Sequence, residues 1–420
     1  MKNVVILGAG TAGTMVANHL GRRWPQGWSL QVVDPETEHL YQPGLLFLPF
    51  GARDERKLRR PRARTLGRGV AWVRQGVQRI DMQRREVWLT DGAKLPYEFL
   101  VIASGAKINP DMTPGLAEPK GAQRIHNFYT LDGAVRLREA LADFPGGRLV
   151  LNIAEMPIKC PVAPLEFLFL ADAFFQRRGQ RRQVELILVT PLEGAFTKRV
   201  CNTKLRYLLE GKGIKLQADF ALAEVDGEKR EIRSYDGRSV AYDLLVTIPV
   251  HTGASYIGHS GLGGEDDLNF VPTHRHNLQA IGQERIFALG DATDLPVSKA
   301  GSVAHFQSSV VAENLLRAMR GQELRGDFDG HVNCFIESGF GKALLIDFNY
   351  ELEPVSGRFP VPGLGPFTLL GESRINHLGK LGFRWLYWNL LLPARPLPIS
   401  NRMSLAGKRI EEAEMHARPA

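Results

Sequence analysis

Three cysteines, Cys160, Cys201 and Cys334, are the side chains of this 420-residue chain with the widest redox chemistry. They are odd in number and far apart, and no CxxC pair is present, so their spacing indicates neither a disulfide framework nor a zinc site. A free cysteine is most often a small buried hydrophobic residue. The sequence around each cysteine must therefore decide which of them is reactive.

Acid–base chemistry has one candidate beside these cysteines. Glu166 follows Cys160 by six residues and could move protons, although an ordinary buried ion pair explains such a glutamate equally well. His126, His251 and His305 are isolated histidines, which are more often structural. No HxxxH or His/Cys spacing indicates a metal ligand set, so we expect no metal.

A glycine-rich turn near the N-terminus predicts a dinucleotide site. It lies between an apolar run at residues 4–7, typical of a buried parallel strand, and a helical pattern over residues 14–20. Gly8 permits the tight turn, Gly10 lets a pyrophosphate approach the backbone, and Gly13 allows close helix packing. The phosphates would then lie on the helix N-terminus, beside Thr11 and Ala12.

The next predicted strand, residues 29–33, supports this interpretation. It ends in Asp34, whose carboxylate is placed to accept hydrogen bonds from a ribose hydroxyl. A GxGxxG motif alone is weak evidence, but here strand, turn, helix and acidic residue follow in the expected order. This order predicts a dinucleotide site and leaves open whether FAD or NAD binds there.

Two later segments distinguish between the two cofactors. Residues 99–106, FLVIASGA, form a strand that runs into a small-residue turn, and residues 286–293, IFALGDAT, form a strand that ends in Gly290 and Asp291. These segments resemble the second and third FAD fingerprints of the flavoproteins with two dinucleotide-binding domains. The resemblance implies that Asp291 holds a ribityl hydroxyl and that Ser104 and Gly105 lie against FAD. Lys299 completes the expected cofactor-binding set.

The second nucleotide site of that superfamily is missing. Members that use NAD(P)H insert a second domain with its own glycine-rich turn. Here the corresponding strand, residues 148–154, is preceded by Gly146 and Gly147 but followed by EMPIKCP, which has no GxGxxG. The close backbone approach that a pyrophosphate requires is therefore not provided. The helical pattern at 167–178 and the strand pattern at 184–189 still predict an α/β unit.

The altered turn contains Cys160. The segment KCPVAPLE, residues 159–166, resembles the central redox motif of sulfide:quinone oxidoreductases, and Cys334 in HVNCFIE occupies the place of a second family cysteine. A disulfide offers hydrosulfide an electrophilic sulfur, and exchange leaves a persulfide and a thiolate. The resemblance implies that Cys334 lies near the flavin and that Cys160 carries the growing sulfane chain. Lys159 and a helix N-terminus after Pro161 are expected to lower the thiol pKa.

The resemblance is incomplete. Many bacterial members have another cysteine about thirty residues before the central one, where this chain has IHNF at 125–128. For Cys201, in KRVCN, we favour a structural role as a small buried hydrophobic residue.

The C-terminal segment 375–392, INHLGKLGFRWLYWNLLL, reads as an amphipathic helix. Asn376, His377, Lys380 and Arg384 form a narrow polar stripe beside a broad apolar face that carries tryptophans and leucines. Charged residues interrupt the run, so it should lie on a membrane rather than cross it, with its lysine and arginine near lipid phosphates. A helix that covers the flavin domain, or a dimer contact, is the alternative. Resemblance to the family's membrane helices gives the expected quinone contacts, which are Phe340, Lys380, Phe383 and Tyr387.

Composition adds few constraints. A net charge of +8 favours an anionic partner without choosing among them, and the basic clusters at 53–68 and 177–182 lack the aromatic interleaving of a single-strand nucleic-acid groove. We expect most of these charges to be solvated surface. No export signal precedes the first strand, so we expect synthesis in the cytoplasm. The amphipathic segment at 375–392 predicts peripheral attachment to a membrane.

These features predict an α/β fold with two Rossmann-like dinucleotide-binding domains and a C-terminal membrane-interface region. The expected order is a first part of the FAD domain at 1–110, an inserted second domain without a functional NAD site at 111–250, the remainder of the FAD domain at 251–330, and the C-terminal region at 331–420.

The predicted function is FAD-dependent oxidation of sulfide to sulfane sulfur or polysulfide, with electrons passed to quinone. Three alternatives stay open. A type II NADH:quinone oxidoreductase needs the missing NADH turn, and the flavoprotein subunit of a flavocytochrome c sulfide dehydrogenase needs a haem partner and export. A flavin protein that stores sulfane sulfur without turnover would reduce its flavin once. Nucleic acid is not an expected partner, and homo-oligomerisation has no residue-level support.

Overall fold

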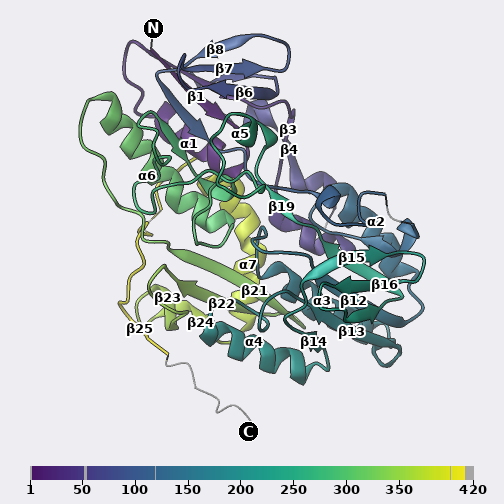
Figure 1. Ribbon diagram of the computed structural model, residues 1–420. Helices are drawn as coiled ribbons and strands as arrows, with labels where there is room; N and C mark the ends of the chain where they lie inside the picture. Colours follow the sequence, from purple (N-terminus) through teal and green to yellow (C-terminus); the bar gives the residue numbers. More distant parts are fainter. Residues whose placement is uncertain (1, 52–53, 119, 398, 412–420) are drawn as a thin grey trace.

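The computed structural model describes residues 2–51, 54–118, 120–397 and 399–411. The upper part of the molecule in Figure 1 contains a five-stranded parallel sheet in the order β20-β9-β1-β2-β5. These strands are β1 (Lys2–Leu7), β2 (Trp28–Val33), β5 (Ala71–Val73), β9 (Phe99–Ile102) and β20 (Ile286–Ala288). Helices α1 (Thr11–Gly21) and α6 (Gly301–Met319) pack against each other beside this sheet. The strands and helices predicted around the glycine turn are confirmed.

A second parallel sheet lies lower in the molecule, in the order β11-β18-β12-β13-β14. Its strands are β11 (Ile125–His126), β12 (Gly147–Ile153), β13 (Val184–Val189), β14 (Lys215–Gln217) and β18 (Leu244–Ile248). The helices of this unit are α2 (Leu131–Ala142), α3 (Ala163–Arg177) and α4 (Arg199–Gly211). The predicted α/β pattern is therefore present although the glycine turn of a nucleotide site is absent.

Small elements complete both units. Two antiparallel three-stranded sheets are formed by β6 (Val77–Asp81), β7 (Glu86–Leu89) and β8 (Lys94–Pro96), and by β15 (Leu222–Asp226), β16 (Glu231–Ser234) and β17 (Ser239–Ala241). The two-stranded pairs are β3 (Glu38–Leu40) with β4 (Arg59–Pro61), and β10 (Lys107–Ile108) with β19 (His251–Thr252); α5 spans Ser255–His259.

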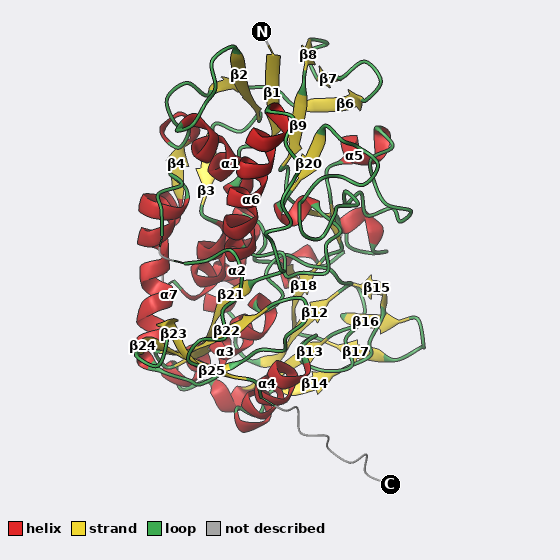
Figure 2. Cartoon of the chain, turned by 90° about the vertical axis from the view of Figure 1, so that its left-hand side faces the viewer, coloured by secondary structure: helices red, strands yellow, loops and turns green. Residues whose placement is uncertain are grey.

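The C-terminal region forms a third five-stranded sheet in the order β21-β22-β24-β23-β25. Its strands are β21 (Val332–Gly339), β22 (Lys342–Phe348), β23 (Ser356–Val361), β24 (Gly365–Leu369) and β25 (Lys408–Arg409). Helix α7 (Arg374–Leu386) packs on β22 and continues into a π-helical turn, Tyr387–Leu391. Figure 2 shows α7 along one edge of the molecule, with β3 and β4 near one of its ends and β23 and β24 near the other. No helix in the described residues is long and apolar enough to cross a bilayer.

Helix α7 turns its polar stripe inward. The Ser373 hydroxyl caps the helix by accepting the Asn376 N–H at 3.0 Å, and the Asn376 side chain is fully buried against the backbone of Thr368 and Gly371. The outward side carries exposed apolar residues at helical spacing: Ile375, Leu378, Leu381 and Trp385, the last 64% exposed. An amphipathic helix is confirmed, and its polar side faces protein.

Candidate active site

The glycine turn between β1 and α1 has the geometry that a dinucleotide needs. Gly8 has φ +98°, and a Cβ there would lie 2.6 Å from the Ala103 carbonyl oxygen. A Cβ on Gly13 would lie 1.9 Å from the Gly8 carbonyl oxygen, so only glycine permits this helix packing. Gly10 has open space beside it, as required where a ligand approaches the backbone.

Asp34 holds this turn in place. One oxygen of its carboxylate accepts the Ala9 N–H at 2.7 Å and the other accepts the Glu36 N–H at 2.9 Å. The buried Arg62 guanidinium lies 3.4 Å from the same carboxylate and also bonds the carbonyl of Ala9. A carboxylate has about four acceptor positions, so these contacts leave capacity for a ribose hydroxyl.

The three predicted fingerprints meet at this turn. A Cβ on Gly8 would lie 2.8 Å from Ser104 Cα, and a Cβ on Gly290 would lie 3.1 Å from Ala12 Cβ, so the turns after β9 and β20 both adjoin the start of α1. Gly290 has φ +68°, and its N–H donates to the Gln307 side chain at 2.7 Å. Gly105 also has positive φ, +69°.

Two charged residues, Asp291 and Lys299, follow β20. Burial raises the pKa of Asp291, and the cations Lys299 and Lys159 act in the opposite direction. The Lys299 ammonium donates to the carbonyls of Asp291 and Thr293 at 3.0 and 2.7 Å, and burial lowers its pKa to about 8. The open glycine turn and the partly buried acid Asp291 together fit FAD, which these residues would hold along its length.

The Cys160 turn is tied to this region by backbone. The Cys160 N–H donates to the Lys299 carbonyl at 2.7 Å, and Lys159 and Lys299 form a parallel β-bridge. Cys160 has φ +49°, a left-handed conformation that is uncommon for a residue with a side chain and that clusters at functional sites. The turn lies at the start of α3, whose Ala163 N–H bonds the Cys160 carbonyl at 2.8 Å.

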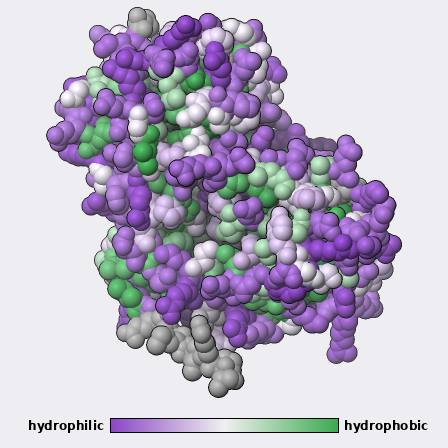
Figure 3. All heavy atoms as spheres, in the orientation of Figure 1, coloured by the Kyte–Doolittle hydropathy of each residue, from purple (hydrophilic) through white to green (hydrophobic). Residues whose placement is uncertain are grey.

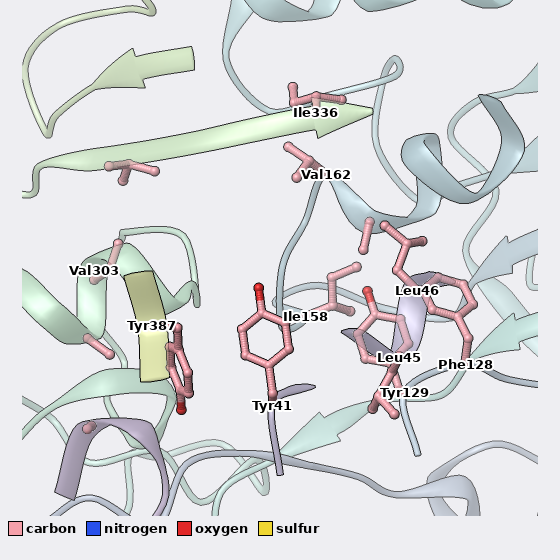
Figure 4. Packing of buried hydrophobic residues seen from close by; sticks show 14 of the residues in the cluster. Tyr41, Leu45, Leu46, Phe128, Tyr129, Ile158, Val162, Val303, Ile336 and Tyr387 are labelled. Atoms are coloured by element: carbon pink, nitrogen blue, oxygen red, sulfur yellow. The ribbon is translucent and has the colours of Figure 1, made fainter. Parts of the chain in front are cut away.

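Cys334 approaches from the other side, on β21. The cysteines belong to segments that pack in one core: Figure 4 shows Val162, two residues after Cys160, beside the strand that carries Ile336, two residues after Cys334. The two thiols are close enough to interact, because Cys334 raises the pKa of Cys160. Both cysteines are partly buried free thiols in this structure.

The thiol pKa values differ from the direction expected from the sequence. Burial, followed by Glu166, raises the pKa of Cys160, and burial raises the pKa of Cys334 to about 11. The nearby cation that lowers both values is Lys380 on α7, and Lys159 does not act on either. The expectation for Lys159 is therefore wrong, because its ammonium points to the Gln42 side chain at 3.2 Å.

A buried charge network joins α3, β21 and α7 at this site. The Glu166 carboxylate, fully buried, pairs with the Lys380 ammonium and accepts the Glu337 N–H at 2.7 Å. The same ammonium donates to the Phe335 carbonyl at 2.9 Å. The buried Glu337 carboxylate bonds His377 Nδ1 at 2.9 Å, and the His377 side chain is 24% exposed. Lys380 is thus held by Glu166, and the expectation that it meets lipid phosphates is wrong.

The remaining predicted quinone contacts lie in different surroundings. Phe340 is 47% exposed in the β21–β22 turn, and Phe383 is partly buried against the main core. Tyr387 is buried, and its hydroxyl contacts Thr11 Oγ1 at 2.8 Å and His39 Nε2 at 2.6 Å. Tyr387 therefore connects the C-terminal helix to the glycine turn, as Figure 4 shows for its position beside Tyr41.

The sequence reasoning missed several residues here. Glu337 and Ser302 were not recognised, although Glu337 lies three residues after Cys334 and the Ser302 hydroxyl is 3.9 Å from Cys334 Sγ. Arg62 was treated only as part of a basic cluster. Tyr129 is buried with its hydroxyl 3.5 Å from the Cys160 carbonyl, and it stacks edgewise on the buried His251.

Cys201 is buried in α4. The described residues contain no cluster suited to a metal ion.

Comparison with known proteins identifies relatives along nearly the whole chain. Residues 2–153 match the pyridine nucleotide-disulphide oxidoreductase family. The mitochondrial sulfide:quinone oxidoreductase of Mus musculus is 24% identical over 93% of this chain and 86% of its own length. The corresponding protein of Dictyostelium discoideum is 26% identical over 94% of this chain and 87% of its own length.

A solved structure shows the same fold. The X-ray structure of the sulfide:quinone oxidoreductase from Aquifex aeolicus superimposes with a TM-score of 0.77 at 18% identity, covering 93% of this chain and 92% of that one. The family resemblance expected from the motifs is confirmed. The chain is an FAD-dependent oxidoreductase that is homologous to the sulfide:quinone oxidoreductases along nearly its whole length.

Proposed function

We propose that this protein oxidises sulfide through a Cys160–Cys334 redox pair and passes the electrons by way of FAD to a membrane quinone. The observation that carries the proposal is that both cysteines lie near Glu166 and Lys380. The turn that holds Cys160 is bonded to Lys299 at the cofactor site. The names of the relatives support the choice of substrates. The domain boundaries and cofactor contacts expected from the sequence belong to the same proposal.

The first step is thiol–disulfide exchange. Hydrosulfide attacks one sulfur of the oxidised pair, an S–S bond forms to the incoming sulfur, and the Cys160–Cys334 bond breaks, leaving one cysteine persulfide and one thiolate. Lys380 stabilises the thiolate, since its ammonium lowers the pKa of both cysteines. Bound FAD would supply a two-electron acceptor and relay to quinone, which takes up two protons with the two electrons.

Protons need a carrier in this buried site. Burial raises the pKa of Glu166 while Lys380 lowers it, so this carboxyl can change protonation state as charge moves between the sulfurs and the cofactor. His377, which meets both solvent and Glu337, is the partly exposed member of the network.

Attachment to a membrane surface through α7 is part of the proposal. The exposed stripe of Ile375, Leu378, Leu381 and Trp385 has the composition of an interfacial helix face. Hydrophobic surface is also visible in the lower left of Figure 3, in the region of β23 and β24, where Val361 and Leu364 are exposed. A quinone could then enter from the bilayer past Phe340 and Phe383.

The test mixes FAD-loaded protein with sulfide and a short-chain quinone, and follows flavin bleaching and quinone reduction. We expect sustained turnover in the wild type and loss of sulfide-driven reduction in Cys160→Ser and in Cys334→Ser, with FAD content unchanged. Full turnover in either variant would refute the cysteine mechanism. Flavin reduction by NADH would favour an NADH:quinone oxidoreductase, and a single reduction without turnover would favour a sulfane-sulfur storage protein.

A further inference from the structure

A basic surface lies at the C-terminal end of α7 and has no part in the chemistry above. Residues 56–68, here called the basic segment, hold seven cationic side chains and no acidic one. Two of them are accounted for inside the protein: Arg62 is buried beside Asp34, and Arg59 pairs with Glu38 at 3.1 Å. The other five are exposed, and none has a carboxylate partner among the described residues: Arg56, Lys57, Arg60, Arg64 and Arg68.

The basic segment is fixed to the end of the C-terminal helix. The Asn18 side chain donates to the Thr65 carbonyl at 2.9 Å and to the Leu392 carbonyl at 2.8 Å, so one amide joins both elements. The Arg60 guanidinium lies 4.5 Å from the centre of the Trp388 ring, which is itself buried. Figure 2 shows β4, which carries Arg60, close to one end of α7 at the same edge of the molecule. The exposed cations and the exposed apolar stripe of α7 are therefore held in a fixed position relative to each other.

We propose that the basic segment binds the phosphate headgroups of anionic phospholipids while the stripe of Ile375, Leu378, Leu381 and Trp385 enters the apolar layer. The chemistry of the surface selects this occupant. Five exposed cations without a carboxylate partner attract a dense anionic surface, and the adjoining apolar residues gain free energy only from a partner that is also apolar. A nucleic acid offers the charge without the apolar layer, and the ring that Arg60 contacts, Trp388, is buried and not free to stack on a base. This inference rests on the membrane attachment in the proposed function and adds the lipid class and the orientation.

The experiment measures binding to vesicles of phosphatidylcholine alone and of phosphatidylcholine with one-third phosphatidylglycerol, by sedimentation at low and high salt. Each basic residue near an anionic bilayer contributes about 5-fold in affinity. We therefore expect the triple variant Arg56→Gln/Arg60→Gln/Arg64→Gln to bind the anionic vesicles about 100-fold more weakly than the wild type, with little change on neutral vesicles. The wild-type preference should fall as salt screens the charges.

A matched control removes three charges elsewhere. Arg177→Gln/Arg178→Gln/Arg182→Gln lowers the net charge equally in the second unit and should leave binding to anionic vesicles within about 2-fold. Both triple variants should keep FAD and the wild-type rate of sulfide-driven reduction of a water-soluble quinone analogue, which reports folding and chemistry separately. Equal loss in both triple variants, or none in the first, would overturn the lipid site while leaving the chemistry intact. Failure of the wild type to bind any vesicle would overturn the membrane attachment as well.

Discussion

Helices α3 and α7 both contribute side chains to the same site, but α3 is buried on most sides whereas α7 has an exposed apolar side. Helix α3 is buried along most of its length, including Phe167, Phe169 and Phe175, and it presents Glu166 to the cysteines. Helix α7 buries Asn376, turns Lys380 toward Glu166, and leaves Leu378 and Trp385 exposed. The difference shows that an amphipathic pattern does not by itself say which face is inward. Here buried carboxylates require the polar face of α7, and the apolar face is left for another partner.

The largest contrast should come from removing one aromatic side chain from each helix. Phe167→Ala leaves a cavity in a fully buried position and should lower the free energy of unfolding by about 3–5 kcal/mol. Trp385→Ala removes an exposed ring and should change it by less than about 0.5 kcal/mol. Denaturant unfolding of the two FAD-loaded variants measures both values. A comparable loss in Trp385→Ala would mean that this ring is part of the folded core.

The contact between the helices can be tested through its ion pair. Lys380→Met leaves the buried Glu166 carboxylate without its cation and should cost about 3–5 kcal/mol of unfolding free energy. Replacing both partners, Glu166→Gln/Lys380→Met, should recover most of that loss because no charge stays buried. The same denaturant titration compares these two variants with the single variant Glu166→Gln. If the double variant is as unstable as the sum of the single ones, the two side chains do not act as a pair.

The environment between the helices also predicts a pH dependence. Burial raises the pKa of Cys334 from its ordinary value of 9.0 to about 11, so in reduced protein its thiol should stay protonated to higher pH than an exposed cysteine. The neutral thiol therefore favours the folded state fully below pH 9 and loses this contribution as the pH rises toward 11. Thiolate absorbance of reduced Cys160→Ser/Cys201→Ser, followed against pH, measures the value. A midpoint near 9 or below would show that Lys380 outweighs burial.

The smallest effect is expected at Cys201, which lies in α4 and takes no part in the contact between α3 and α7. Cys201→Ala should leave sulfide-driven turnover within about 2-fold and lower the free energy of unfolding by about 1 kcal/mol, because a small buried side chain is lost. Steady-state turnover and denaturant unfolding are the measurements. A loss of turnover with FAD retained would give Cys201 a redox role.

Much of this site was predictable from short-range patterns. The glycine turn, Asp34 and the Gly290–Asp291 turn are each read from a few consecutive residues, and the structure brings them together as expected. The strand and helix pattern around Cys160 was also correct, although α3 begins four residues earlier than its predicted start at Phe167.

The long-range pairings could not be predicted. Lys380 is 214 residues from Glu166, and no local pattern indicates that one side of α7 covers a buried acid. The same limit explains the wrong expectation for the thiol pKa, because the neighbouring Lys159 is oriented away and the effective cation comes from a distant helix. The pairing of Glu337 with His377 was missed for the same reason, since it needs the register of β21 against α7.

The central claim is that Cys160 and Cys334 form one redox pair, and peptide mapping of the air-oxidised protein by mass spectrometry tests it most directly. Without reductant, we expect the peptide that contains Cys160 to be linked to the peptide that contains Cys334, and Cys201 to be recovered as a free thiol. Brief exposure to sulfide should open the link and add one sulfur to one of the two cysteines. Three free thiols after oxidation, or a link that involves Cys201, would contradict the account.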